Sequence, residues 1–237
     1  MIVRAAAARM APVLGDPAAS LARSGAAIEA AAAAGARLVV LPELANAGYV
    51  FASAAEAAAA AEPVPGPTTE RWAQLAAAHD LVVVGGVCER DEAGRTRNTS
   101  VVVDAGGVRG RYRKLHLWGD EPDVFVAGDA PAPVVDTAVG RIGLAVCYDL
   151  WFPELPRGLA LAGADIVAVS ANLTDEPWQD GLPHVHVMTA IATAHLSRVH
   201  LVLADRCGPE RGARWLGAAL VADATGRLLD YLLGGGQ

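Results

Sequence analysis

The sequence has few cysteines and no long apolar run, and both shortages restrict the class of protein. Its three cysteines, Cys88, Cys147 and Cys207, cannot all pair within one chain, and they lack the density of a disulfide framework and the spacing of a zinc site. Gly, Pro or charged residues interrupt every apolar run before the about 20 residues that a membrane helix requires. We therefore expect a cytoplasmic protein with no membrane partner.

The sequence has no excess of basic charge, and we expect no secretory leader. Its 26 acidic residues outnumber the 19 basic ones and give a formal net charge of -7, which disfavours binding to nucleic acid. The basic cluster at 109–114 is split if it forms a strand, because Arg111 and Arg113 then face one side while Tyr112 and Lys114 face the other. The first residues show no basic end followed by an apolar centre and a cleavage site.

No linker rich in Gly, Ser or charge divides the chain, and no repeat of fixed period occurs. With 237 residues, of which 53% are apolar, the chain is long enough to bury a core. We expect a single domain over residues 1–237. Ala-rich segments of helical length alternate with Val- and Leu-rich runs, a pattern typical of layered α/β architecture with buried strands.

The apolar pattern predicts the positions of individual elements. Strands are expected over 3–8, 37–41, 81–88, 98–104, 110–114, 141–147, 166–171, 201–205 and 218–222. Helices are expected over 17–34, 69–79, 152–162 and 185–197, and the alanine tract at 54–61 also favours helix. Asp16 before Pro17 indicates a helix start. Gly35 and Gly163 lie where a helix end takes a left-handed residue.

Three reactive side chains, Glu43, Lys114 and Cys147, stand at the ends of predicted strands. Strand ends are where sites assemble in α/β proteins. Each residue alone has an ordinary structural explanation, since acids and lysines mostly lie on the surface and a cysteine is usually a small core residue. Together, a thiol, a carboxylate and a fixed cation are the components of an amide-cleaving site.

The sequence around these residues resembles the nitrilase superfamily of carbon–nitrogen hydrolases, in the amidase and N-carbamoyl hydrolase-like branch. Its characteristic segments occur in the right order, as LPELANAGY at 41–49, YRKLHL at 112–117 and GLAVCYDLWFPE at 143–154. The likeness extends to WGDEPDVF at 118–125 and to SAN at 170–172, and it covers the chain up to about residue 227.

The resemblance implies a fold, a reaction and an assembly. The fold is a four-layer αββα sandwich, in which two mixed β-sheets are flanked by helices. The reaction is hydrolysis of a small amide or N-carbamoyl compound to acid plus ammonia through a cysteine thioester, without cofactor or metal. The partners are a small-molecule amide, carbamoyl or nitrile substrate and a second copy of the chain, giving a homodimer or a larger homo-oligomer through the helical face.

The resemblance also implies catalytic roles. Cys147 attacks the substrate carbon, and Glu43 acts as general base. Lys114 and the backbone N–H of Tyr148 stabilise the oxyanion. Glu121 matches a second glutamate that the family places beside the site, where it orients substrate or keeps Lys114 and Glu43 in their working protonation states.

Substrate-binding positions follow from the same resemblance. Tyr49, Tyr148, Trp151 and Asn172 are expected around the substrate, with Trp118 a weaker candidate. The acidic segment 173–183 is expected near the pocket mouth, where it would disfavour anionic substrates.

Other residues near the motifs are expected to be structural. Asp149, Glu154 and Arg157 follow the nucleophile and are expected to hold its turn, and His116 is expected to be a framework histidine. Cys88 and Cys207 are expected to be structural or incidental.

Several alternatives stay open. A nitrilase would use the same thiol to convert a nitrile to its acid, and an inactive scaffold would keep the fold without activity. A papain-like enzyme needs a histidine base, and no histidine here lies in such a setting. His184 and His186 could form a metal pair on a strand, but with no acidic or Cys partner nearby we expect surface or pocket-rim histidines. The segment 193–197 and the short C-terminus depart from the family pattern.

Overall fold

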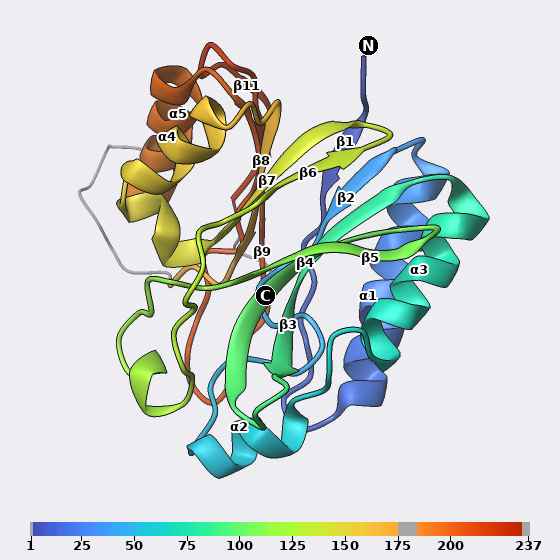
Figure 1. Cartoon of the computed structure of the whole chain (residues 1–237), viewed down its shortest axis with the longest axis vertical. Helices are drawn as coiled ribbons and strands as arrows, with labels where there is room; N and C mark the ends of the chain where they lie inside the picture. The colour runs from blue at the N-terminus through green and yellow to red at the C-terminus, as the bar shows by residue number, and fades with distance from the viewer. Residues whose placement is uncertain (1, 175–183, 234–237) are drawn as a thin grey trace.

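The structure is a computed structural model that describes residues 2–174 and 184–233. Two mixed β-sheets lie face to face, and helices cover the outer face of each sheet (Figure 1). The first sheet has the order β1 (Ala5–Ala7), β2 (Leu38–Val40), β3 (Val82–Arg90), β4 (Thr96–Asp104) and β5 (Gly107–Arg113). The second has the order β11 (Leu228–Leu232), β10 (Ala219–Ala222), β9 (His200–Asp205), β8 (Ile166–Ala171), β7 (Gly140–Val146) and β6 (Val134–Thr137).

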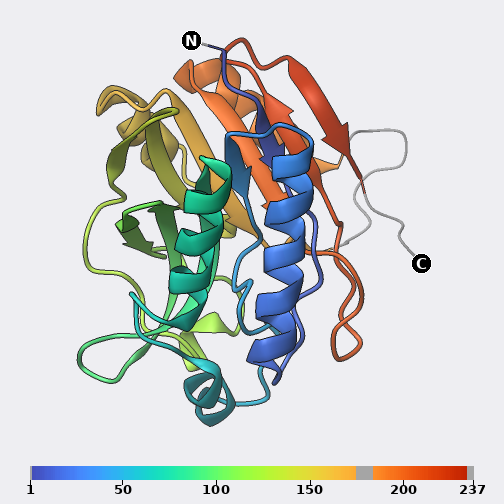
Figure 2. The same cartoon turned by 90° about the vertical axis from the view of Figure 1, so that its right-hand side faces the viewer.

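The helices form the two outer layers. Helices α1 (Pro17–Ala33) and α3 (Pro67–His79) lie side by side over the first sheet (Figure 2), and α4 (Glu154–Leu161) and α5 (Val185–Ser197) cover the second. A short α2 (Ala54–Ala60) and the 3-10 turns η1 (Glu121–Asp123) and η2 (Cys147–Trp151) lie in the connections. The predicted αββα sandwich is therefore confirmed.

The core has three apolar layers because side chains on each strand alternate in direction. On β2, Leu38 and Val40 pack between the two sheets, while Val39 packs under α1 and α3 with Trp72. On β8, Ile166 and Ala168 join the layer between the sheets, and Val167 and Val169 pack under α4 and α5. Strands buried on both faces explain the continuous apolar runs in the sequence.

The local signals for helix ends are confirmed at atomic detail. The Asp16 side chain accepts a hydrogen bond from the backbone N–H of Ala19 at the start of α1. Gly35, after α1, and Gly163, after α4, both have positive φ angles, of 81° and 89°. Among the described residues, no helix is long and apolar enough to cross a membrane.

Two strands were not predicted from the sequence. β6 is a short hairpin partner of β7, and the prolines at 131 and 133 conceal its pattern. β11 is an edge strand with mostly exposed side chains, so it lacks the alternation of a half-buried strand. A third difference concerns Cys147, which was expected to end a strand but begins η2, with a left-handed φ of 46°.

Candidate active site

Glu43 lies in the loop that follows β2, and its side chain is completely buried. The backbone of β3 passes so close that a Cβ atom at Gly86 would lie 2.5 Å from the Cα of Glu43. The backbone N–H of Glu43 also points across to the second sheet, where the Ala171 carbonyl accepts it at 3.4 Å. Glycine at position 86 is therefore part of what fixes the carboxylate in place.

Lys114 follows β5 and is the only lysine in the chain. Its ammonium donates to Glu43 Oε1 at 2.7 Å and to Glu121 Oε1 at 2.9 Å. The predicted alternation along this strand is confirmed, because Lys114 is buried while Arg111 and Arg113 pair with Glu89 on the other face.

Glu121 begins η1 and is buried rather than a surface acid. Its Oε1 accepts from Lys114 and from the Tyr49 hydroxyl at 2.8 Å, and its Oε2 accepts from the backbone N–H of Trp118 at 2.8 Å. One ammonium thus lies between two buried carboxylates.

Asn98 is a member of this cluster that sequence reasoning missed. Its Nδ2 donates to Glu43 Oε1 at 2.6 Å, and its backbone carbonyl accepts from the N–H of Lys114 at 2.8 Å. Lys114 and Asn98 together occupy Oε1 of Glu43, whereas Oε2 is buried and has no hydrogen-bond partner among the described residues. The only signal in the sequence was a polar residue at the start of an apolar strand.

Cys147 faces this cluster from the second sheet. Its Sγ lies 3.7 Å from the carbonyl oxygen of Asn172, and Asn172 Nδ2 donates to the backbone carbonyl of Glu43 at 3.2 Å. Asp149 closes the turn by accepting from the N–H of Val146 at 2.9 Å, and it contacts His116 Nδ1 at 2.8 Å. The structure therefore brings together the thiol, carboxylate and ammonium that the sequence singled out.

The electrostatics of the cluster follow from burial and from the charges that share it. Burial raises the pKa of Glu43 above its usual range; Lys114 opposes this shift and Glu121 adds to it. Burial alone would lower the pKa of Lys114, but the two carboxylates raise it above the ordinary value, so the ammonium stays charged. Burial and the charge of Glu43 hold the pKa of Cys147 well above its usual range, so the resting thiol is protonated.

A small pocket that opens to solvent leads to Cys147. Its described wall consists of Trp118, Tyr148, Trp151, Asn172, Leu173, Thr174 and His186. Three of the four expected substrate-binding residues, Tyr148, Trp151 and Asn172, thus line the approach to the thiol.

Tyr49 is placed differently from the other three. Its hydroxyl donates to Glu121, and its ring packs edge-on against Trp215 with centroids 5.3 Å apart. Its backbone N–H donates at 2.8 Å to Glu210, a buried acid that also accepts from the N–H of Val50 at 2.6 Å and pairs with Arg206 at 2.8 Å. Tyr49 therefore contacts the acid network rather than the pocket wall, and Glu210 and Trp215 are further residues that sequence reasoning missed.

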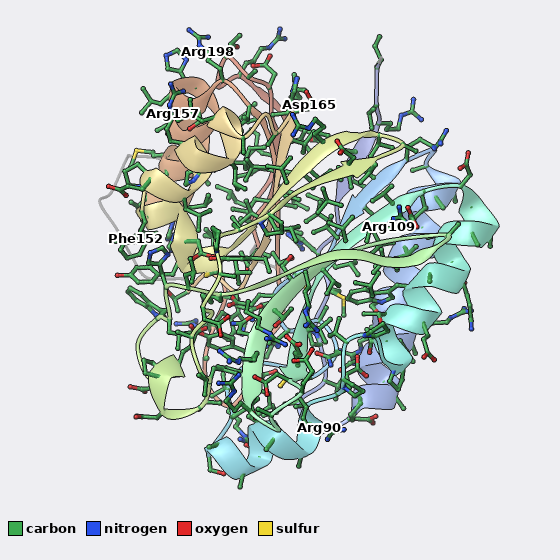
Figure 3. The ribbon with its side chains drawn as sticks, viewed as in Figure 1. Arg90, Arg109, Phe152, Arg157, Asp165 and Arg198 are labelled. Carbon is green, nitrogen blue, oxygen red and sulfur yellow. The ribbon has the colours of Figure 1, made fainter. Side chains whose placement is uncertain are left out.

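The structure also places the residues near the nucleophile that were expected to be structural. His116 stacks on Phe152, with centroids 3.7 Å apart, and contacts Asp149, as a framework histidine would. Arg157 is exposed on α4 (Figure 3), and Glu154 is exposed at the start of the same helix. Of the three residues expected to hold the nucleophile turn, Asp149 is the one whose side chain bonds to it in the described part of the chain.

The histidine pair lies at the pocket rim at the start of α5, with ring centroids of His184 and His186 5.0 Å apart. Within residues 2–174 and 184–233, no group of three or more His, Cys, Asp or Glu is placed to hold a metal ion. The expectation for the acidic segment 173–183 falls mostly on residues 175–183, which lie outside the described residues.

A buried carboxylate and a buried ammonium that act on a protonated thiol at the end of a small pocket define the class of hydrolases that attack carbon–nitrogen bonds with a cysteine. The family model for carbon-nitrogen hydrolases matches residues 4–232, and the chain belongs to this family.

Similar proteins support the assignment to this family. A nitrilase of Pyrococcus abyssi is 34% identical over 97% of this chain and 84% of its own length. An (R)-stereoselective amidase of a Pseudomonas species is 36% identical over 91% of this chain and 75% of its own length. The solved structure of an amidase from Nesterenkonia sp. superposes with a TM-score of 0.82 and 28% identity, covering 98% of this chain and 88% of that one.

Proposed function

We propose that this protein hydrolyses a small amide or N-carbamoyl compound to acid plus ammonia, with Cys147 as nucleophile and Glu43 as general base. The observation that carries the proposal is the difference between the two carboxylate oxygens of Glu43. Its Oε1 is held by Lys114 and Asn98, while the buried Oε2 is free to take a proton.

In the first half of the reaction, the thiol cannot act as a preformed thiolate because its pKa lies well above the usual range. Glu43 Oε2 therefore takes the proton as Sγ bonds to the substrate carbon. The carbonyl oxygen becomes an oxyanion, which the ammonium of Lys114 and the backbone N–H of Tyr148 stabilise. Lys114 has three N–H donors and uses two on Glu43 and Glu121, which leaves one for the oxyanion.

In the second half, Glu43 returns its proton to the nitrogen, the carbon–nitrogen bond breaks, and ammonia leaves a thioester on Cys147. Glu43 then takes a proton from a water molecule, whose oxygen bonds to the thioester carbon. Loss of the carboxylic acid returns the proton to the sulfur. One carboxylate thus serves as base, acid and base again, and its raised pKa suits both directions of transfer.

Glu121 fits a supporting role in this scheme. Together with Glu43 it keeps Lys114 charged, and its own charge helps to raise the pKa of Glu43. Tyr49 and the backbone N–H of Trp118 hold Glu121 in that position. We therefore assign Glu121 to the catalytic group, and we assign Tyr49 the role of positioning Glu121.

The test is the mass of a covalent adduct on the nucleophile, formed when the sulfur displaces fluoride from fluoroacetamide. A glutamate-to-glutamine variant of the Nesterenkonia amidase carries the acetamide moiety of fluoroacetamide on its active-site cysteine. We expect Glu43→Gln of this protein, incubated with fluoroacetamide, to gain one acetamide moiety on Cys147, located by peptide mass spectrometry. A label on Cys88 or Cys207 instead, or on none, would contradict the role of Cys147 and favour an inactive scaffold.

A nitrilase activity is the second candidate, supported by the likeness to the Pyrococcus abyssi nitrilase. Both reactions pass through a thioester, so the residues around Cys147 do not separate them. Ammonia release from paired amides and nitriles with the same acyl group does, and we expect the amide to be the better substrate.

We further propose that the protein is cytoplasmic and pairs through its α4 and α5 layer. Leu161 on α4 and Leu196 on α5 are 74% and 71% exposed, as expected of apolar residues that a partner covers. Light scattering of the purified chain tests the assembly, and a monomer at micromolar concentration would contradict it.

A further inference from the structure

The walls of the pocket beside Cys147 are formed by aromatic rings that rest on one another. Trp118 and Tyr148 meet edge to face with centroids 4.7 Å apart, and Trp151 lies 6.0 Å from Trp118 and 5.7 Å from Tyr148. The His186 ring extends the wall, 5.9 Å from Trp151. Because these rings pack on each other, they present one continuous surface rather than separate contacts.

Two rings of this wall are exposed to solvent at the mouth of the pocket. Trp118 and Trp151 are 37% and 43% exposed, although each is large and apolar. Exposed aromatic surface at the mouth of a pocket that ends at a nucleophile is typical of a ligand-binding wall. The rest of the described wall consists of Leu173, another apolar side chain, and of Asn172 and Thr174, which are polar but uncharged.

The same wall has no cation for an anionic substrate. Among the described residues that line the pocket there is no arginine or lysine to pair with an anion, and no aspartate or glutamate to pair with a cation. Lys114 is the only lysine of the chain and already faces two carboxylates. Burial and the neighbouring His184 lower the pKa of His186 to about 4, so its ring is neutral at physiological pH. A carboxylate bound here would lose water without gaining a charged partner.

Resting on the proposed function, we propose that the acyl group of the substrate is uncharged and apolar, either aliphatic or aromatic, and that His186 is a residue that determines this specificity. The acyl chain lies against the wall of Trp118, Tyr148 and Trp151, with its carbonyl carbon at Cys147. His186 extends the wall with a neutral ring at the position where a cation would be needed to admit a carboxylate.

A panel of primary amides of similar size tests the preference: butyramide and phenylacetamide are neutral, succinamate is anionic and 3-aminopropanamide is cationic. At pH 7.5 we expect kcat/KM for the neutral amides to exceed that for both charged amides by about tenfold or more. A preference for succinamate or for 3-aminopropanamide would overturn the proposal and leave the hydrolase function standing.

The role of His186 is tested by His186→Arg, which adds a cation to the wall. We expect the ratio of kcat/KM for succinamate to that for butyramide to rise by about tenfold. The control is Gln74→Arg, which adds the same charge on the exposed side of α3, in the opposite helical layer, and is expected to leave the ratio unchanged. Equal ratios in the two variants would overturn the role of His186.

Binding separates a failure of this inference from a failure of the proposed function. Cys147→Ala cannot form a thioester but keeps the aromatic wall, so quenching of tryptophan fluorescence reports ligand binding without turnover. Tighter binding of phenylacetamide than of succinamate supports the inference even if the wild type hydrolyses neither compound. The reverse order overturns it.

Discussion

The hydrogen bond from Asn98 to Glu43 gives a sharp prediction for the pH dependence of the reaction. Asn98 Nδ2 lies 2.6 Å from Glu43 Oε1 and stabilises the ionised carboxylate in a fully buried site. A hydrogen bond to a charged group contributes about 1.5–3 kcal/mol, and one pKa unit corresponds to about 1.4 kcal/mol. Asn98→Ala should therefore raise the pKa of Glu43 by about 1–2 units.

The sign of the effect on rate follows from the role of Glu43. The carboxylate must be ionised to take the thiol proton, so activity falls as the pH drops below its pKa. Raising this pKa moves the acidic limb of the pH profile up by about 1–2 pH units, and activity recovers at higher pH. The thiol itself has a raised pKa, so it does not produce this acidic limb.

The assay is kcat/KM for ammonia release across the pH range, since this parameter reports the free enzyme. The matched control is Thr99→Val on the same strand, which removes a hydrogen bond from the Thr99 hydroxyl to Glu89 on the opposite face. Thr99→Val should leave the acidic limb in place. An unshifted limb in Asn98→Ala, or an equal shift in both variants, would refute the role of Asn98.

Three further substitutions test other parts of the site. Lys114→Ala removes an oxyanion donor worth about 3–4 kcal/mol and should lower kcat for ammonia release about a hundredfold or more; full activity would exclude that role. Gly86→Ala brings a methyl group to 2.5 Å from the Glu43 backbone and should lower kcat/KM about a hundredfold, whereas Gly158→Ala, with nothing within 4 Å, should not. Glu210→Gln leaves the buried Arg206 without its carboxylate partner and should lower the urea-derived free energy of unfolding by about 3 kcal/mol, while the control Glu56→Gln, in a partly exposed ion pair with Arg211, should change it little.

The sequence was informative where local rules decide the structure. Alternation along β5 correctly separated Lys114 from Arg111 and Arg113, because strand side chains alternate whatever their partners are. Apolar runs that end in Glu43 and Cys147 also marked the right neighbourhoods, because the two strands belong to different sheets whose ends meet, as the hydrogen bond from the Glu43 N–H to the Ala171 carbonyl shows.

The sequence was uninformative where pairing between distant segments decides the structure. Asn98 reaches Glu43 only because β4 lies between β3 and β5 in a particular register, which its own neighbours do not specify. Glu210 accepts a hydrogen bond from the backbone N–H of Tyr49, although the two residues are 161 positions apart in the sequence. The left-handed φ of Cys147 had no signal at all, because nothing in a cysteine side chain favours that conformation.

The site spans the seam between the two sheets, and this placement decides how its geometry is maintained. Glu43 and Lys114 follow strands of the first sheet, whereas Cys147 and Asn172 follow strands of the second. Asn172 joins the two sides, because its carbonyl lies 3.7 Å from the thiol while its side chain donates to the Glu43 carbonyl at 3.2 Å. The buried carboxylate of Asp205 holds the next residue by accepting from the N–H of Leu173 at 2.8 Å. Since a displacement of about 1 Å in a reacting group can cost a hundredfold in rate, the distance between nucleophile and base depends on this one segment after β8 as much as on the reacting groups.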